Sequence, residues 1–378
     1  MVGLLTLDSK IYNYGGFLQE MALQDAIKEL GYECEIIDYD INQEVYTFSL
    51  KRGLKNLSYR KIKNKFLKRK ELAISEEVAA AIAMRKHAID LYRDSNLYLS
   101  KKIIRAELYN LTSKYNQLVC GSDQIWNPDY NIPSFFLNFG TSECNKIIYA
   151  ASIGRNYLTR HEKNVYEKYL KYPDYISVRE KSAQSIISKL TEKTIELVLD
   201  PTLLHTKKYW LEKANNSSFE YKDYIFCYFL NLTDEKIKAA CDFAKKNKYT
   251  IITIPYLHNR YENDSERLCG KMLSNVNPAD FLKLIMDADV ILTDSFHATV
   301  FSIMFEKDFW CFKRDVGMYN MNTRLHTLLE YVSLEERMIE VSDLKNKVCM
   351  KNTKISFKKL DEQRQYSRKF LKDALSLN

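Results

Sequence analysis

The sequence predicts an α/β fold with two domains of similar size and a ligand-binding cleft between them. Short apolar runs, which are typical of buried parallel strands, alternate along most of the chain with stretches of helical periodicity. A polar stretch rich in Asn and Ser at 213–222 divides this alternation into two series. The length of 378 residues is sufficient for two domains.

The first series opens with a strand over 2–7, a helix over 17–30 that a following glycine ends, and a strand over 34–38. Residues 50–115 interrupt the alternation and predict two or three helices. The series then continues with strands and helices over 117–120, 146–150, 159–171, 175–178, 180–190 and 195–199. We expect one domain over 1–211, with residues 50–115 as an insertion.

The second series predicts a further domain over 222–350. The expected strands are 224–230, 249–254, 290–293 and 309–312, and the expected helices are 233–245, 278–286, 296–305 and 323–331. Asn277 followed by Pro278 is a typical helix start. A last helix over 356–375, within the segment 351–378, can cross back to the first domain.

Composition and cysteine spacing exclude several classes of protein. Hydrophobic residues make up 46% and charged residues 28%, as in soluble globular proteins. No apolar run reaches the roughly 18 residues of a membrane span, and the N-terminus lacks the regions of a signal peptide. The eight cysteines show neither C-x-x-C nor metal-ligand spacing. We therefore expect a cytoplasmic protein with buried free thiols and no metal site.

The segment 51–70 is strongly basic. It contributes ten Lys or Arg and no acid to a net charge of +8, and its apolar residues have near-helical spacing. A basic amphipathic helix of this kind can lie on an anionic membrane or bind a phosphate-rich partner. It is also compatible with a solvated surface. No recognition motif accompanies the charge, so we expect no nucleic-acid partner.

Ligands of parallel α/β sheets bind beyond the carboxyl ends of the strands, so the residues that follow each strand are candidates for the site. After the first strand come Asn13, Tyr14, Gly15 and Gly16, followed by Gln19. The glycines let the backbone approach a ligand closely, and a helix N-terminus attracts anions. The chain has neither a G-x-G-x-x-G nor a Walker A pattern, which disfavours dinucleotide and P-loop chemistry.

The loop after the strand 117–120 has residue types that suit a sugar. It carries Asp123, Gln124 and Trp126. A carboxylate and an amide can bind sugar hydroxyls, and an indole can cover the apolar face of a sugar ring. The alternative is a turn capped by Asp and Asn, with Trp126 in the core.

Two arginines and an aspartate follow other strands of the first series. Arg179 stands where a strand gives way to a helix, where a guanidinium can clamp a phosphate or a carboxylate. A salt bridge to Glu180 or to a neighbouring helix is the alternative. Arg155 follows the strand 146–150. Asp200 can orient a basic group or simply start a turn.

In the second series, Ser295, Phe296 and His297 lie at a junction from strand to helix. His297 falls in the first helical turn, where the helix dipole favours a neutral imidazole and anionic ligands nearby. Arg324 opens a later helix and offers a further cation for an anion. We interpret His297 as the candidate acid or base.

The ordered set of these motifs resembles the polysaccharide pyruvyl transferase family. The resemblance runs from 13 to 324 and is carried by the segments 13–16, 121–127, 177–180, 199–202 and 294–298. It implies two Rossmann-like domains in the GT-B arrangement, with the active site in the interdomain cleft. It also implies transfer of an enolpyruvyl-derived group from phosphoenolpyruvate to a sugar, forming a pyruvate ketal, with no other cofactor.

The resemblance implies roles for individual residues. His297 matches the catalytic histidine of the family, and Arg179 matches an arginine that contacts phosphoenolpyruvate. Either Asp123 or Asp200 can deprotonate an acceptor hydroxyl, and we place Asp123 with His297 as catalytic. The expected acceptor-binding residues are Asn13, Tyr14, Gly15, Gly16, Gln19, Gln124 and Trp126.

One motif departs from the family pattern. Several members have Arg-Leu-His where this chain has Ser295, Phe296 and His297, so a phosphate-binding arginine is absent. The cations that can replace it are Arg324, Arg155 and Lys313. Unless the donor differs, the expected donor-binding residues are Arg179, Ser295, Phe296, Arg324 and Arg155.

The resemblance also implies partners, because many members act on capsule, exopolysaccharide or cell-wall glycans. We expect a sugar or lipid-linked glycan acceptor, at the inner face of the membrane if the segment 51–70 docks there. Two alternatives remain open: a GT-B glycosyltransferase that uses a nucleotide sugar, and a non-catalytic relative that binds glycans or membranes.

Overall fold

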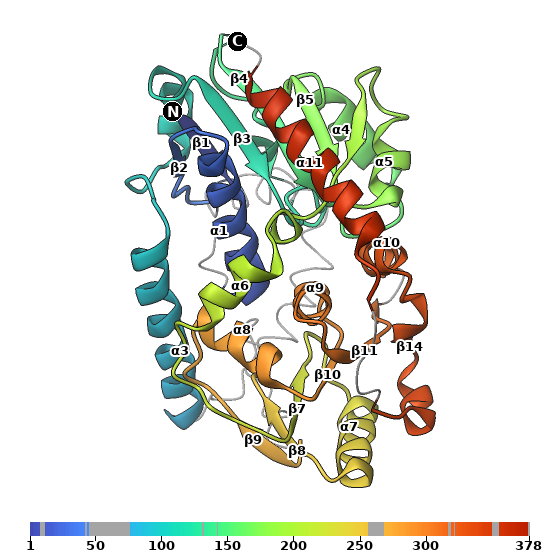
Figure 1. Ribbon diagram of the computed structural model, residues 1–378. Helices are drawn as coiled ribbons and strands as arrows, with labels where there is room; N and C mark the ends of the chain where they lie inside the picture. Colours follow the sequence, from blue (N-terminus) through green and yellow to red (C-terminus); the bar gives the residue numbers. More distant parts are fainter. Residues whose placement is uncertain are drawn as a thin grey trace, which may run out of the picture.

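The computed structural model describes residues 1–7, 12–41, 44, 76–130, 132–141, 143–255, 268–316, 319–320, 322–349 and 355–376. Within these ranges the chain forms two parallel six-stranded sheets with flanking helices (Figure 1). The predicted α/β fold is therefore confirmed. The basic segment 51–70 lies outside the described residues, so the helix predicted there remains a prediction.

The first sheet has the strand order β2-β1-β3-β4-β5-β6. Its strands are β1 (Val2–Leu5), β2 (Cys34–Ile36), β3 (Gln117–Gly121), β4 (Asn145–Ala151), β5 (Tyr175–Val178) and β6 (Ile195–Leu197). The apolar runs that predicted these strands are buried, as parallel sheets require. The chain reverses direction across the sheet between β1 and β3. The loops after these two strands therefore flank the position where such sheets bind ligands.

The second sheet has the strand order β14-β11-β10-β7-β8-β9. Its strands are β7 (Tyr224–Tyr228), β8 (Thr250–Thr253), β9 (Gly270–Met272), β10 (Val290–Thr293), β11 (Asp308–Phe312) and β14 (Met338–Ile339). The reversal lies between β7 and β10, so the loop that leads to His297 flanks the corresponding position here. A separate antiparallel pair is formed by β12 (Asp315–Val316) and β13 (Tyr319–Asn320).

Helices alternate with the strands as expected, and one further helix over 207–214 was not predicted. They are α1 (Tyr14–Glu29), α4 (Arg160–Tyr169), α5 (Lys181–Ile187), α6 (Lys207–Ala214), α7 (Asp234–Asn247), α8 (Pro278–Asp287), α9 (Phe296–Met304) and α10 (Thr323–Val332). The first of them starts three residues earlier than predicted. Asn13 caps it by accepting a hydrogen bond from the Gly15 amide at 3.0 Å, which offsets the weak helix propensity of two glycines.

The insertion contains α3 (Glu76–Asn96) and a 3-10 helix (Arg105–Ser113). Although α3 belongs to the first series, it is attached to the second sheet. The guanidinium of Arg85 donates hydrogen bonds to the carbonyls of Ser274 at 3.0 Å, Leu273 at 2.9 Å, and Pro255. The insertion therefore connects the two halves of the molecule.

The last helix, α11 (Lys358–Ser376), packs on the first sheet although it follows the second (Figure 1). Gln117 of β3 and Asn145 of β4 donate side-chain hydrogen bonds to the carbonyls of Leu375 and Ala374 at 2.6 and 2.7 Å. The hydroxyl of Ser367 accepts a hydrogen bond from the Leu199 amide at 2.9 Å. The chain thus returns to the first half at its end.

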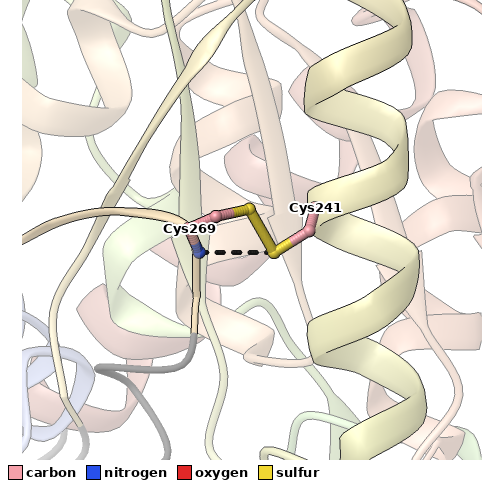
Figure 2. Close-up of a disulfide and its surroundings, with 2 residues drawn as sticks. All are labelled: Cys241 and Cys269. Atoms are coloured by element: carbon pink, nitrogen blue, oxygen red, sulfur yellow. Dashed lines mark hydrogen bonds between the residues drawn. A yellow bond between two sulfur atoms is a disulfide. The ribbon is translucent and has the colours of Figure 1, made fainter.

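Two cysteines differ from the prediction of free thiols. Cys241 of α7 and Cys269, just before β9, form a disulfide with a Cα–Cα distance of 5.9 Å (Figure 2). The prediction was wrong here because the two cysteines lie 28 positions apart in sequence, and their contact depends on the packing of α7 against β8, the strand that pairs with β9. The other six cysteines form no disulfide within the described residues, and five of them are buried.

Two kinds of feature are absent from the described residues. No helix combines the length and apolar composition that crossing a membrane requires. No group of three or more His, Cys, Asp or Glu side chains in the described ranges has the geometry of a metal site.

Candidate active site

Five elements bring polar side chains together where the carboxyl ends of the two sheets meet. Asp123 follows β3, Arg179 follows β5 and Asp200 lies beyond β6, all in the first half. His297, in the first turn of α9, and Arg324, in the first turn of α10, come from the second half. We call these five residues the junction cluster. Residues far apart in sequence meet here because parallel strands present their carboxyl ends at one edge.

Arg179 is the centre of the junction cluster. Its Nη1 donates to Asp200 Oδ2, and its Nη2 lies 2.5 Å from Asp123 Oδ1. Only 1% of the side chain is exposed. Burial would raise the pKa of Asp123, but Arg179, His297 and Arg324 outweigh it and lower that pKa. Both terminal nitrogens of Arg179 therefore bind carboxylates, and a ligand must displace one to reach them.

Asp200 is buried and fully hydrogen-bonded. Its Oδ1 accepts hydrogen bonds from the amide and the hydroxyl of Thr202 at 3.0 and 2.6 Å. Its Oδ2 faces Arg179 and lies 3.7 Å from Nε2 of His297. Burial by itself would raise the pKa of Asp200, yet Arg179 and His297 hold it well below its usual range. An ionised carboxylate therefore stands beside the imidazole and can stabilise its protonated form.

The N-terminus of α1 lies directly against His297. A Cβ at Gly15 would come within 2.0 Å of Nδ1 of the imidazole, so only glycine fits this position. A Cβ at Gly16 would meet no atom nearer than 3.9 Å. This close contact fixes the Nδ1 side of the imidazole ring, and Asp200 faces the other ring nitrogen, Nε2. Gly15 is thus a packing partner of the candidate catalytic group.

Arg324 lies beside Arg179 but has fewer partners. Its Nη1 is 3.8 Å from Asp123 Oδ1, which is too long for a hydrogen bond. The guanidinium groups of Arg179 and Arg324 lie 4.8 and 5.7 Å from the centre of the Phe296 ring. Burial and the adjacent Arg179 lower the pKa of Arg324 to about 10, so it stays charged at neutral pH. Phe296 therefore holds two cations near the start of α9.

The start of α9 can take part in anion binding. Ser295 caps this helix by accepting a hydrogen bond from the Ala298 amide at 3.4 Å. The amides of Phe296 and His297 open the helix and have no acceptor within it. Together with Arg324 they offer an anion two backbone donors, a positive helix end and a guanidinium.

Two of the residues predicted to bind the acceptor sugar, Gln19 and Gln124, form hydrogen bonds that shape the loop of Asp123. The amide oxygen of Gln19 accepts from Ser122 N at 3.0 Å, and its nitrogen donates to Thr6 Oγ1 and to Gly16 O, both at 3.0 Å. Gln124 bonds to Asn127 at 2.7 Å, and its amide lies 3.3 Å from Nη1 and Nη2 of Arg324. Gln124 is therefore close to the junction cluster, whereas Gln19 is a buried support.

Trp126 and Tyr14 have structural environments. The indole of Trp126 is 1% exposed, donates to Phe135 O at 3.1 Å and stacks on Phe136 with centroids 4.9 Å apart. Tyr14 is equally buried, stacks on Phe281 of α8 at 4.7 Å and donates to Val276 O at 2.9 Å. Neither ring has a free face for a sugar. We correct their acceptor-binding role: Trp126 belongs to the core, the alternative that its sequence allowed, and Tyr14 joins the two halves.

The three candidates for the missing arginine differ in position. Arg155 pairs with Glu162 of α4 at 2.8 Å, and Lys313 pairs with Glu340 at 2.7 Å. Arg324 alone of the three has a contact with Asp123 and with the ring of Phe296. The geometry therefore favours Arg324, and the donor-binding role of Arg155 stays a prediction.

Glu180 is a buried residue that the sequence suggested only as a partner of Arg179. Its Oε1 instead accepts hydrogen bonds from Ser152 Oγ at 3.0 Å and from the Ile153 amide at 2.9 Å. Its Oε2 is buried without a hydrogen-bond partner among the described residues, and burial raises the pKa of this carboxyl. The sequence offered one signal that Glu180 belongs to the site, namely its place directly after Arg179 in a motif at the end of a strand. Glu180 joins the ends of β4 and β5.

Comparisons with known proteins agree with this architecture. The UDP-GlcNAc 2-epimerase of Methanocaldococcus jannaschii has 12% identity, covers 98% of this chain and 99% of its own, and gives a TM-score of 0.52. The enzyme of the same name from Neisseria meningitidis has 9% identity, coverage of 98% and 93%, and a TM-score of 0.47. At these identities the likeness concerns the fold alone, which is the two-domain α/β fold of the GT-B type. No curated protein matches the sequence.

A family model matches most of the chain. The model of polysaccharide pyruvyl transferases covers residues 13–316, from the cap of α1 to the end of β12. The match includes every member of the junction cluster except Arg324. It also includes Gly15, whose contact with His297 joins the two halves at the site. The chain belongs to the polysaccharide pyruvyl transferase family.

Proposed function

We propose that this protein transfers the pyruvyl group of phosphoenolpyruvate to two hydroxyls of a sugar and so forms a pyruvate ketal. The acceptor is a cell-surface polysaccharide or its lipid-linked precursor. The observation that carries the proposal is the junction cluster. It places an imidazole beside a buried carboxylate, with an arginine and a helix N-terminus for an anion.

The donor has a carboxylate and a phosphate, so its site needs cations and amide donors. Arg324 and the first amides of α9 supply these. Arg179 holds Asp123 and Asp200 with both terminal nitrogens, and therefore positions them rather than binding the donor in this arrangement. In this proposal Arg324 takes the place of the arginine that several family members have at the position of Ser295.

The reaction requires one proton transfer to carbon and one loss of phosphate. His297 in its protonated form gives a proton to the methylene carbon, and the first sugar hydroxyl forms a bond to the adjacent carbon. Phosphate leaves with its bonding electrons, the second hydroxyl bonds to the same carbon, and the two hydroxyl protons pass to His297 and to phosphate. Asp123 accepts a hydrogen bond from an attacking hydroxyl, and Asp200 stabilises the imidazolium. All atoms come from the two substrates, so no redox cofactor takes part.

A lipid-linked acceptor would place the enzyme at the inner face of the cytoplasmic membrane. The basic composition of the segment 51–70 supports this placement, because a cluster of Lys and Arg is attracted to anionic lipids. Binding to vesicles with and without anionic lipid tests this part of the proposal.

The test of the reaction is release of phosphate from phosphoenolpyruvate, with a panel of hexosides and N-acetylhexosaminides as acceptors and detection of the ketal by mass spectrometry. His297→Ala should abolish release and retain the melting temperature. His326→Ala is the matched control, because this exposed histidine lies on α10. Full turnover by His297→Ala would contradict the mechanism. Transfer from UDP- or GDP-sugars without any use of phosphoenolpyruvate would show a glycosyltransferase instead.

A further inference from the structure

A hollow of about 520 Å³ lies between α3, the segment after α6 and the start of α8. Its volume is in the range of ligand sites, roughly 300–1,000 Å³. Each of the three segments contributes an asparagine: Asn96, Asn216 and Asn275. Two aromatic rings, Tyr92 and Phe219, complete the wall. None of the lining residues belongs to the junction cluster.

The polar groups of this hollow have unused hydrogen-bonding capacity. Within the described residues, the side chains of Asn216, Ser218 and Asn275 form no hydrogen bond. Asn96 donates from Nδ2 to Tyr92 O at 2.8 Å, and its oxygen is left over. A carboxamide both donates and accepts, which matches the adjacent hydroxyls of a sugar ring. The aromatic rings can cover the apolar face of such a ring.

The walls of the hollow are fixed in the absence of a ligand. Asp280 accepts a hydrogen bond from Ser217 at 2.6 Å and another from the Asn277 amide at 2.9 Å. Arg85 holds α3 to the carbonyls of Leu273 and Ser274, next to Asn275. The segments that form the walls are therefore held before a ligand binds, and a ligand would have to order only the exposed side chains of Asn216, Ser218 and Asn275.

The charge of the lining favours an uncharged ligand. All lining residues lie in the described ranges, and they include no Lys and no Arg. Asp280 is the one carboxylate among them, and both of its oxygens already accept hydrogen bonds. His87 is the one lining residue that can carry a positive charge, so the lining offers an anionic polymer little counter-charge, whereas a neutral polyhydroxyl ligand would find amides and rings.

The hollow adjoins the active site through Tyr14. Its hydroxyl donates to the carbonyl of Val276, which stands between Asn275 and Asn277 in the chain. The next residue of α1, Gly15, touches the imidazole of His297. Tyr14 therefore links a segment at the wall of the hollow to the helix start that packs on His297.

We propose that this hollow is a second subsite that binds neutral sugar units of the acceptor other than the unit that reacts. The inference rests on the proposed function only in that the acceptor is a glycan. It predicts that the protein binds oligosaccharides independently of phosphoenolpyruvate and prefers chains over single sugars.

The test is binding of four tetrasaccharides, made of glucose, galactose, mannose or N-acetylglucosamine, to the full-length protein by isothermal titration and saturation-transfer NMR. Asn275→Ala combined with Asn216→Ala should weaken binding of the best tetrasaccharide by about tenfold, because two hydrogen-bonding groups are lost. Asn215→Ala is the matched control, since this neighbour of Asn216 is exposed but does not line the hollow. Ser218→Trp, which fills the hollow, gives an independent second variant.

A second pair of variants uses α3 alone. Leu91 is 56% exposed and lines the hollow, whereas Met84 is 48% exposed on the same helix and does not. Leu91→Ala should weaken tetrasaccharide binding and Met84→Ala should leave it unchanged. Equal effects of the two would argue against the subsite.

The outcomes separate this inference from the proposed reaction. His297→Ala should bind the tetrasaccharide as tightly as the wild type while losing transfer. If the wild type transfers pyruvate to a monosaccharide but binds none of the four tetrasaccharides, the subsite is wrong and the reaction stands. If tetrasaccharides bind and the hollow variants bind them equally well, the glycan is held elsewhere and the inference fails. Loss of binding in the hollow variants, without phosphoenolpyruvate turnover in any protein, would support the subsite and remove the reaction.

Discussion

The two neighbouring arginines of the junction cluster have different roles, one in stability and the other in donor binding, and single mutations can separate these roles. Removing Arg179 leaves Asp200 buried without its counter-charge, so Arg179→Ala should lower the free energy of unfolding by about 3–5 kcal/mol. Arg324→Ala removes a cation that makes no hydrogen bond to Asp123 and should change that free energy by less than about 1 kcal/mol. It should instead weaken phosphoenolpyruvate binding at least about tenfold, as one charged contact is lost. Urea unfolding and isothermal titration give both quantities.

The reverse pattern would contradict this assignment. If Arg179→Ala kept its stability and lost donor binding, the guanidinium of Arg179 would be the donor contact. Arg155→Ala is a suitable control for donor binding, because that guanidinium pairs with Glu162 instead.

The lowered pKa of Asp200 also predicts a dependence of stability on pH. Its ion pair stabilises the folded state fully above the unfolded-state pKa, near 3.9, and the contribution is lost as pH falls further. The wild type should therefore be more stable than Asp200→Asn by a constant amount from pH 7 to about pH 5. Below about pH 4 the difference should shrink. Urea unfolding at each pH measures it, and a difference that stays constant down to pH 2 would disprove the pairing.

At the scale of single elements, the start of α1 packs closely against His297 in the first turn of α9. Gly15→Ala would put a methyl group within 2.0 Å of His297 Nδ1, so α1 or the imidazole must move. We expect turnover to fall at least about a hundredfold, since a misplacement of about 1 Å at a reacting group has that effect. Gly16→Ala is the control, because its methyl would meet no atom nearer than 3.9 Å. Steady-state kinetics and circular dichroism of both variants decide the matter, and equal activity would refute the contact.

At the scale of the whole molecule, the two halves are expected to unfold together. One hydrophobic cluster contains residues of both sheets, such as Leu4 and Phe226, and α11 returns from the second half to the first. Variants that retain only Trp126 or only Trp310 report on the separate core clusters of the first and second sheets. Their fluorescence should give the same midpoint in urea. Two clearly separate midpoints would show that the halves are independent.

Much of the fold followed from local patterns. Apolar runs such as 146–150 and 290–293 became buried strands of parallel sheets, because a strand covered on both faces must be apolar throughout. The prediction of α1 missed its first turn, since two glycines weaken a helix and the cap by Asn13 restores it. The disulfide was missed because its partners approach only after α7 packs against β8, the strand that pairs with β9.

The sequence by itself determined which residues stand at the ends of strands, and so which residues had to gather at one edge. Asp123, Arg179, Asp200 and His297 meet for that reason. Only the tertiary structure decided how they pair. In the folded protein Arg179 pairs with two carboxylates, Trp126 lies in the core and Gly15 packs against the imidazole of His297. Strand ends are encoded by local periodicity, whereas these contacts depend on how two separately patterned halves pack together, which no local pattern specifies.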